Sequence, residues 1–335
     1  MTSTAGKARV LSGMQASGLL HLGNYHGALE SWVRLQDDYE CFYFVADWHA
    51  LTTLFDKPGE VGRFSLQVAL DFLACGVDPE KSTLFLQSDV KQHAELSVLL
   101  GMMTPVPWLE RVPSYKDKKR ELAGSDLSSI GFLGYPVLQT ADIAIYRAAY
   151  VPVGEDQLPH LELAREIVRR FNHFYGPILV EPKEIVTPTP VLPGLDGRKM
   201  SKSYGNAVYL SDDDETVTGK LRNAVTDPQR ARRKDPGRPE VCNIYAYHRL
   251  YSSKERCQEI DRDCRSAAIG CVDCKKDLIA RFFAFFGEIR ERRRQLAARP
   301  DYLRQVLDEG AQRAGRVAEE TMVEVRRAMG LGVEA

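Results

Sequence analysis

Along about the first 200 residues, short apolar runs alternate with longer segments in which apolar residues recur at helical spacing. The nearly continuous apolar runs at 8–11, 40–46 and 82–87 are typical of parallel strands that are buried on both faces. Between and after them, segments such as 58–75 and 158–174 place an apolar residue at every third or fourth position, as an amphipathic helix does. This alternation predicts an α/β fold built on a doubly wound parallel sheet.

The pattern changes after residue 207. From residue 246 onward the apolar spacing is helical throughout, and strands no longer alternate with helices. We therefore predict a Rossmann-like domain at 1–207 and a helical domain at 208–335. In doubly wound sheets ligands bind at the carboxyl ends of the strands, and both Asp47 and Gln87 fall at such ends.

Composition narrows the class of protein. The chain has 335 residues, of which 44% are hydrophobic and 27% charged, as is typical of a globular protein with room for two or three domains. The net charge is −1, so any surface for nucleic acid must be a local patch. The first residues, MTSTAGKARV, lack the apolar core of a signal peptide, and no run approaches membrane-spanning length. We therefore expect a cytoplasmic protein without a membrane segment.

The stretch VLSGMQASGLLHLGN is the first candidate for chemistry. Its apolar run is predicted to break at Gly13 and again at Gly18, before a helix that begins near His21 and Asn24. A helix N-terminus offers unpaired N–H groups and the positive end of a dipole, which suits a phosphate group. These glycines and Gly23 allow backbone to approach a ligand closely. The alternative interpretation is an ordinary strand-to-helix turn with a surface histidine.

A second candidate is the polar segment GRKMSKS at 197–203. Lys199 and Lys202 stand three positions apart on a serine-rich loop, where mobile ammonium groups can clamp a polyphosphate. The alternative interpretation is a solvated basic loop, which is the commoner fate of lysine-rich segments.

A third candidate is a polar helix face within 134–147, a helix in which Pro136 is expected in the first turn. Tyr135, Gln139 and Asp142 are spaced four and three positions apart, so they share this face. If the face is buried, its amide and carboxylate need hydrogen-bond partners. They form either a ligand site or a satisfied polar network in the core.

The seven cysteines fall into two groups. Cys41 and Cys75 lie among apolar residues and are predicted to be inert core residues. Of the other five, Cys257 is an additional thiol, and the spacing C-x21-C-x6-C-x2-C is formed by Cys242, Cys264, Cys271 and Cys274. Because cytosolic chains rarely hold disulfides, this cluster indicates a metal site rather than bridges. A zinc ion and an iron–sulfur cluster are both compatible with four cysteines, and reduced core thiols are the third possibility.

Together these segments resemble the class I aminoacyl-tRNA synthetases, and within them the tryptophanyl-tRNA synthetases. HLGN near the N-terminus with KMSKS much later is a specific pair. The segments SGMQASGLLHLGNYHGAL, VADWHALTT, GYPVLQTADIAIY, VPVGEDQLPHLELAREIVRRFN and GRKMSKSYGN follow the order of the tryptophanyl family. The tail DEGAQRAGRVAEETMVEVRRAMGL is also similar, so the resemblance covers nearly the whole chain.

The resemblance implies a two-step ligase. The first step joins the carboxylate of L-tryptophan to the α-phosphate of ATP and releases pyrophosphate; the second transfers the acyl group to the 3′ end of tRNA(Trp). Domain 1–207 would bind ATP and tryptophan, and domain 208–335 would bind the tRNA anticodon. Mg²⁺ bridging the phosphates and a homodimeric state are implied in the same way.

The resemblance also implies roles for individual residues. The implied catalytic residues are His21, Asn24, Lys199 and Lys202. The implied ATP-binding residues are Gln15, Ala16, Ser17, Gly23, Asn24, Gly154, Glu155, Asp156, Val191, Lys199, Met200, Ser201, Lys202 and Ser203. The implied tryptophan-binding residues are Leu11, Tyr135, Gln139, Asp142 and Gln157. Ala16 departs from the proline usual in the family, and Gln139 from the apolar residue of one bacterial branch.

The segment GCVDCKK at 270–276 resembles a branch of the family that binds a 4Fe-4S cluster in the helical domain. The ligands that this resemblance implies are Cys242, Cys264, Cys271 and Cys274, with a structural role for the cluster. The gap after Cys242 is one residue shorter than in that branch. Zinc at the same four cysteines is the alternative.

Other functions stay open at this point. A tyrosyl-tRNA synthetase shares the fold and a Tyr–Gln–Asp helix face, although GNYHGA and ADWHALT favour tryptophan. An adenylyltransferase of the same superfamily would lack the full KMSKS loop and the long helical tail. A non-catalytic RNA-binding or iron–sulfur regulatory relative would have lost some of the four implied catalytic residues.

Overall fold

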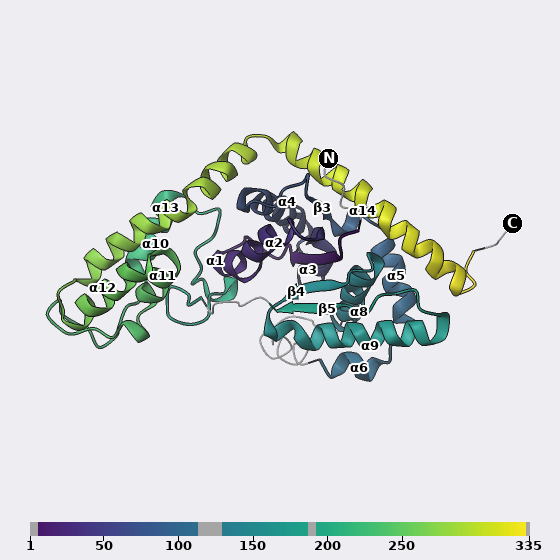
Figure 1. Cartoon of the computed structure of the whole chain (residues 1–335), viewed down its shortest axis with the longest axis horizontal. Coiled ribbons are helices and arrows are strands. Elements are labelled where there is room, and N and C mark those ends of the chain that lie inside the picture. Colours follow the sequence, from purple (N-terminus) through teal and green to yellow (C-terminus); the bar gives the residue numbers. More distant parts are fainter. Residues whose placement is uncertain (1–5, 113–128, 187–191, 333–335) are drawn as a thin grey trace. The chain divides into compact units, whose positions relative to one another are not determined.

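Five parallel strands form the sheet of this computed structural model, which describes residues 6–112, 129–186 and 192–332 (Figure 1). The strands are β1 (Arg9–Gln15), β2 (Glu40–Ala46), β3 (Ser82–Leu86), β4 (Tyr150–Val153) and β5 (Lys183–Val186). Their order in space is β3-β2-β1-β4-β5, and each neighbouring pair is parallel. The chain therefore winds outward from β1 in both directions, which confirms the predicted α/β fold with a doubly wound sheet.

Helices connect and cover the strands. Those before residue 180 are α1 (Leu22–Asn24), α2 (Glu30–Leu35), α3 (Asp47–Leu54), α4 (Pro58–Cys75), α5 (Gln92–Gly101), α6 (Val106–Glu110), α8 (Ile130–Ile145) and α9 (Leu158–Tyr175). Later in the chain follow α10 (Asp214–Asn223), α11 (Asn243–Tyr251), α12 (Lys254–Arg265), α13 (Cys271–Ala297) and α14 (Pro300–Ala328). A π-helical segment, Tyr25–Leu29, joins α1 to α2. None of the helices in the described residues is long and apolar enough to cross a membrane.

The strand next to β1 shows why a continuous apolar sequence forms a buried strand. In β2, each residue after Glu40 is buried. Tyr43 stacks on the Trp32 ring of α2 with a centroid distance of 4.6 Å, and Phe42 stacks on the Tyr146 ring at 4.7 Å. The two faces of the strand are thus covered by aromatic rings that come from different parts of the chain, as expected for a parallel sheet.

Two local predictions were wrong. The predicted break at Gly13 does not occur, because β1 runs through it to Gln15. The glycine makes room for a neighbour instead: a Cβ at this position would lie 2.7 Å from the Phe44 ring. Helix α8 begins at Ile130 rather than at 134, because the Ser129 hydroxyl caps it by accepting from the Phe132 N–H at 3.1 Å. Pro136 consequently lies inside the helix.

The chain divides into two compact units by its internal packing. The sheet unit comprises Met1–Gly18, Gly27–Thr189 and Leu296–Ala335, and the helical unit comprises Leu19–His26 and Pro190–Gln295. The domain prediction from the sequence had placed the segment Leu296–Ala335 in the helical domain, whereas it packs with the sheet unit. The boundary predicted after residue 207, from the end of the strand–helix alternation, stays a prediction.

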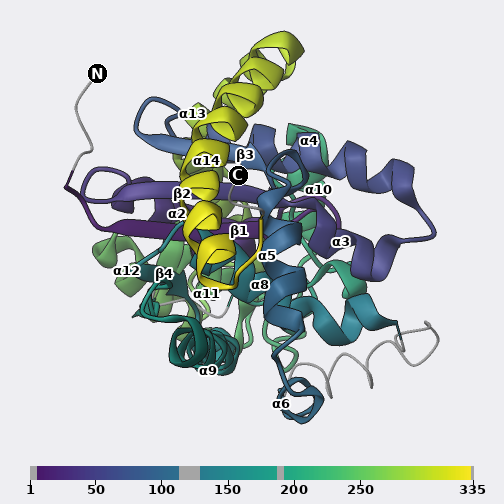
Figure 2. The same cartoon turned by 90° about the vertical axis from the view of Figure 1, so that its right-hand side faces the viewer.

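Helix α14 belongs to the sheet unit because it covers β3 and α5 (Figure 2). Its buried face, Ala314, Ala318 and Met322, joins the apolar core that contains Phe85. At the edge of this core, the Arg326 guanidinium of α14 donates two hydrogen bonds to Glu95 of α5, at 2.6 and 2.7 Å. The helix backbone comes so close to β3 that a Cβ on Gly310 would overlap the backbone carbonyl of Leu84.

The close approach of α14 to β3 predicts the effect of a single methyl group. Gly310→Ala pushes the helix off the strand and lowers the free energy of unfolding by about 1–3 kcal/mol, the usual cost of overpacking a core. Gly315→Ala is the matched control on the same helix, since nothing lies within 4 Å of its added Cβ, and it should be neutral or stabilising. Urea unfolding of the two variants checks this; equal midpoints would contradict the described packing.

Candidate active site

The HLGN segment forms the start of a helix, as predicted. His21 is the N-cap of α1, in extended conformation, and its backbone N–H donates to Asn24 Oδ1 at 3.0 Å. Gly23 makes room for the imidazole, since a Cβ there would lie 2.9 Å from Cε1 of His21. Among the described residues, the buried Nδ1 atom of His21 has no hydrogen-bond partner. The motif therefore presents an imidazole nitrogen and a helix N-terminus together.

The KMSKS loop is held by one buried amide. Asn206 is 3% exposed, and its Oδ1 accepts from the Ser201 N–H at 2.9 Å. Its Nδ2 donates to Asp196 Oδ1 at 2.7 Å and to the Lys199 carbonyl at 3.2 Å. Gly194 lies against this amide, which leaves no space for a Cβ at that position. The loop is consequently ordered around Asn206, while the Lys199 side chain extends to the surface.

The two signature motifs meet within the helical unit. The Leu22 N–H donates to the Val208 carbonyl at 3.0 Å, and His21 pairs with Tyr209 in an isolated β-bridge. Burial, and after it the positive charge of Lys202, lower the pKa of the His21 imidazole from 6.5 to about 4. The imidazole is therefore neutral at physiological pH, and the Lys202 ammonium is close enough to influence it.

Asp142 lies at the centre of a buried polar network in the sheet unit. The carboxylate is 1% exposed; its Oδ1 accepts from Gln87 Nε2 at 2.8 Å and from His93 Nδ1 at 2.6 Å, and its Oδ2 accepts from His49 Nε2 at 2.8 Å. Burial raises the pKa of this carboxyl, but the hydrogen bonds and charges of the two histidines outweigh it and lower the pKa to about 2. On the other side of the His93 ring, the Nε2 atom is hydrogen-bonded to the Tyr146 hydroxyl at 2.7 Å.

The sequence interpretation missed the donors of this network. It assigned Asp142 a role and placed Gln87 at a strand end where ligands bind, but it did not connect Gln87 with Asp142 and gave no role to His49 or His93. Two of the donors follow directly on buried strands, since His49 is in α3 after β2 and Gln87 comes after β3. Position at a strand end was the available signal for these two. His93 has no such signal, because α5 brings it to the network from a later turn.

The remaining predicted residues are distributed over several elements. Gln15, at the end of β1, donates from Nε2 to the His49 carbonyl at 2.5 Å, and Ala16 is fully buried beside it. Leu11 belongs to the apolar core. Tyr135 is half-buried, and its hydroxyl lies 3.4 Å from His160 Nε2. The half-buried or exposed members are Ser17, Gln139, Gly154, Glu155, Asp156, Gln157 and Ser203, whereas Met200 is buried. Val191 lies outside the described residues.

Four thiols gather in the helical unit. Burial and the neighbouring thiolates of Cys242, Cys264 and Cys271 raise the pKa of Cys274 to about 12. Burial, and after it the charge of neighbouring thiolates, also raises the pKa of Cys242 and of Cys264. The Cys257 thiol donates to the His248 carbonyl at 3.3 Å instead. Among the described residues, no set of three or more histidine, cysteine or acidic side chains is arranged to hold a metal ion.

A buried cation accompanies these thiols. Arg230 is 9% exposed, its Nη1 lies 3.5 Å from Cys264 Sγ, and within the described part of the chain its Nε has no hydrogen-bond partner. Gly237 is pressed against both, since a Cβ there would lie 2.5 Å from Cys264 Sγ and 3.2 Å from Arg230 Cδ. The Nη2 of Arg230 donates to the Arg233 and Ile269 carbonyls, and among the described residues no carboxylate pairs with it. A buried guanidinium of this kind is costly unless an anionic group lies nearby.

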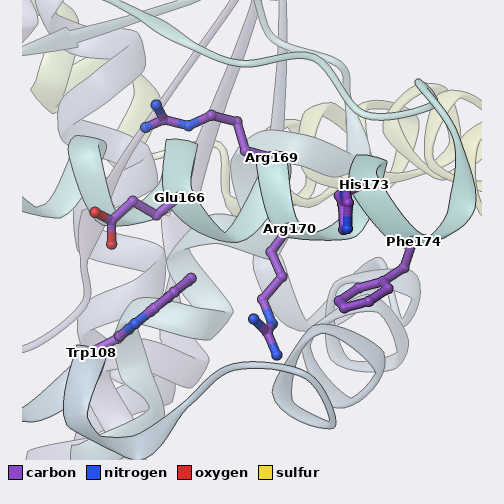
Figure 3. A pocket seen from close by; sticks show the side chains of 6 residues that line it. All are labelled: Trp108, Glu166, Arg169, Arg170, His173 and Phe174. Atoms are coloured by element: carbon purple, nitrogen blue, oxygen red, sulfur yellow. The ribbon is translucent and has the colours of Figure 1, made fainter.

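A surface pocket of about 440 Å³ lies between α6 and α9 (Figure 3). The Arg170 guanidinium lies over the rings of Trp108 and Phe174, 5.7 and 5.3 Å from their centroids, and its Nε donates to the Met103 carbonyl. Glu166, Arg169 and His173 complete the lining. None of the residues assigned to ATP or tryptophan lines this pocket, so it is a separate feature of the sheet unit.

Comparisons with known proteins agree with these motifs. The pattern of the family "tRNA synthetases class I (W and Y)" matches residues 3–287. A tryptophan–tRNA ligase of Thermotoga maritima is 51% identical over 325 residues, covering 96% of this chain and 99% of the relative. The tryptophan–tRNA ligase of Aquifex aeolicus is 44% identical and covers 96% of this chain and 100% of its own.

The folds agree as well. The crystal structure of tryptophanyl-tRNA synthetase from Campylobacter jejuni complexed with ADP and tryptophan has a TM-score of 0.89 and 37% identity, with 96% of this chain and 100% of that one covered. Sequence motifs, fold and relatives thus point to the same group. The chain therefore belongs to the class I tRNA synthetases for tryptophan and tyrosine, and within them to the tryptophan–tRNA ligases.

Proposed function

We propose that this ligase selects L-tryptophan through Asp142, activates it with ATP at the HLGN and KMSKS motifs, and transfers it to tRNA(Trp) bound by the helical domain 208–335. The first reaction forms a bond between the tryptophan carboxylate oxygen and the α-phosphorus of ATP, and pyrophosphate leaves. The second passes the acyl group to the terminal ribose of the tRNA, and AMP leaves. Neither step needs a covalent bond to the protein, so positioning and charge stabilisation do the catalytic work.

The buried Asp142 carboxylate is the observation that carries the proposal. A carboxylate has about four lone-pair positions and no donor, and three of these positions are used by Gln87, His93 and His49. The remaining position, on Oδ2, suits a single N–H donor such as the indole of tryptophan. With its pKa at about 2 the group stays ionised at neutral pH and cannot donate to a ligand. A phenylalanine side chain would leave it without that partner.

ATP is the proposed ligand of the helix start at His21 and of the KMSKS loop. The Nδ1 atom of His21 has no hydrogen-bond partner within the described residues. Together with the α1 N-terminus and the Lys202 ammonium, it suits the oxygens of a polyphosphate. The nucleotide site is proposed to be completed by Gln15–Ser17, Gly154–Asp156, Val191 and residues 199–203. Mg²⁺ would supply positive charge to the phosphates. Lys199 and Lys202 would neutralise the charge that grows on departing pyrophosphate, because Lys provides a compact, movable positive charge.

An iron–sulfur cluster is the proposed occupant of the four thiols. The donor set of four cysteines suits a 4Fe-4S cluster, and the buried Arg230 supplies the cation that the negative charge of thiolate ligands requires. The cluster would hold Cys242 to α12 and α13 and so stabilise the helical domain. It supplies no redox step to the reaction. Zinc at the same cysteines is the alternative, with the same counter-charge.

A homodimer is proposed as the working form. Among the described residues, Val98, Met102 and Val106 are exposed by 56, 79 and 52%, close together in the sequence at the end of α5 and the start of α6. A second copy of the chain would remove such exposed apolar side chains from water.

The wild-type protein should exchange pyrophosphate into ATP in the presence of tryptophan, and not of tyrosine or phenylalanine. Asp142→Ala should lose about 2–4 kcal/mol of discrimination between tryptophan and phenylalanine, because a buried charged hydrogen bond disappears. Asp71→Ala, which removes another buried carboxylate of the sheet unit, is the control. The measurement is the ratio of kcat/KM for the two amino acids. A variant at Asp142 that still rejects phenylalanine as well as wild type would make this residue merely structural.

Lys202→Met should lower kcat of activation far more than it weakens ATP binding, because the ammonium acts on charge that develops in the transition state. The same change should raise the pKa of His21 above about 4, since one of its two causes is removed, yet keep it below 6.5 because burial remains. Lys199→Met is the matched control: it should lower kcat but leave the titration of His21 unchanged. NMR of the imidazole and exchange kinetics check both; a parallel rise of the ATP dissociation constant would indicate simple phosphate anchoring.

Anaerobically purified protein should be brown and contain about four irons and four sulfides per chain. Cys264→Ser should lose the colour and lower the melting temperature, whereas Cys257→Ser should keep both, since this thiol bonds to the His248 carbonyl. Metal analysis and absorption spectra decide the outcome. A colourless protein with one zinc per chain would replace the iron–sulfur assignment.

A further inference from the structure

One face of α11 carries three buried polar side chains. Asn243, Tyr247 and Tyr251 are spaced four residues apart, so they form a row along the helix. They are 7, 0 and 9% exposed. Buried polar groups of this kind need partners, and the partners of this row lie in the two signature motifs or directly beside them.

The first two members hold the base of the KMSKS loop. Asn243 Nδ2 donates to the Gly194 carbonyl at 3.1 Å, and the Tyr247 hydroxyl donates to the Pro193 carbonyl at 2.6 Å. Pro193 is itself paired with Lys199 across the loop in an antiparallel bridge. A shift of these two carbonyls therefore moves the backbone that carries the lysines.

The third member of the row, Tyr251, is bonded to the helical segment that follows the HLGN motif. The Tyr251 hydroxyl is hydrogen-bonded to His26 Nε2 at 3.0 Å, in the helical segment that begins at His21. The Tyr25 ring next to it packs edge-on against Phe286 with a centroid distance of 5.1 Å. The row thus begins at one motif and ends at the other.

We propose that Asn243, Tyr247 and Tyr251 are positioning residues that align the HLGN motif with the KMSKS loop, so that His21 and Lys202 act on the same phosphates in the activation step. This rests on the proposed function. None of the three touches the reacting atoms in this scheme; they act through Lys202 and His21. A helix is stiff enough to align the two motifs, because its backbone hydrogen bonds fix the distance from one end of the row to the other.

The test removes single hydroxyl groups. Tyr247→Phe and Tyr251→Phe keep the rings and the packing but lose the bonds to Pro193 and His26. Tyr245→Phe is the matched control on the same helix, because its hydroxyl donates to the Cys257 carbonyl at 3.4 Å, away from both motifs. Tryptophan-dependent pyrophosphate exchange, tryptophan binding and thermal unfolding are measured for each.

For Tyr247→Phe and Tyr251→Phe we expect kcat to fall between about fivefold and thirtyfold, the effect of losing one or two kcal/mol of alignment. The tryptophan dissociation constant should stay within about twofold of wild type, and Tyr245→Phe should match wild type. A cycle with Lys202→Met gives the sharper readout: Tyr247→Phe should cost less in a chain that already lacks Lys202 than in wild type, because part of its effect passes through this lysine and the rest through Lys199, which is paired with Pro193.

Equal kcat for Tyr247→Phe, Tyr251→Phe and Tyr245→Phe would overturn the proposal. So would full additivity with Lys202→Met, or a loss of activity that follows the melting temperature, since each marks a purely structural role. Wild-type protein without tryptophan-dependent exchange would instead overturn the proposed function itself, which separates the two failures.

Discussion

A charge taken out of water must be given hydrogen-bond donors, and the Asp142 carboxylate obtains its donors from segments far apart in the sequence. His49 follows β2, Gln87 follows β3, and His93 comes from α5. Each of these hydrogen bonds fixes one element against α8. A single carboxylate thus determines the positions of the ends of β2 and β3 and of the helices α3 and α5. The arrangement is rigid because an unpaired carboxylate in this position would cost several kcal/mol. The same rigidity suits a site that distinguishes one N–H group from none.

The KMSKS loop is organised differently, mainly around neutral groups. The Asn206 amide holds the KMSKS loop through backbone N–H and carbonyl groups, and the α11 row holds the base of the loop in the same manner. Apart from the Asp196 carboxylate, which accepts a hydrogen bond from Asn206, these bonds are made to main chain and do not use the lysine side chains of the loop. Lys199 consequently reaches the surface, where it can follow a ligand. The network around Asp142 is thus held by a charge, and the KMSKS loop mainly by bonds to backbone groups.

Much of this was predictable from the sequence. Continuous apolar runs identified the parallel strands, and the pairing of HLGN with KMSKS identified the family. Predictions from the local sequence pattern were wrong where a residue distant in the sequence determines the local structure. Gly13 resembles a strand break, but the Phe44 ring of the neighbouring strand occupies the space that a side chain would need. The donors of Asp142 were missed for the same reason, because which strand ends become neighbours depends on the whole topology. The α11 row was not predicted, because two of its partners are backbone carbonyl groups, which have no sequence signature, and the third, His26, lies 225 positions away in the sequence.

The packing of α14 on β3 has a consequence for synthesis of the protein. Leu84 and Gly310 touch in the folded chain, yet the ribosome releases β3 long before α14. During that interval the apolar core around Phe85, Leu96 and Leu100 lacks the cover that Ala314, Ala318 and Met322 later provide. β3 is also an edge strand, the kind of strand that pairs with other chains when it is exposed. The nascent chain therefore carries an incompletely covered sheet until α14 has been made.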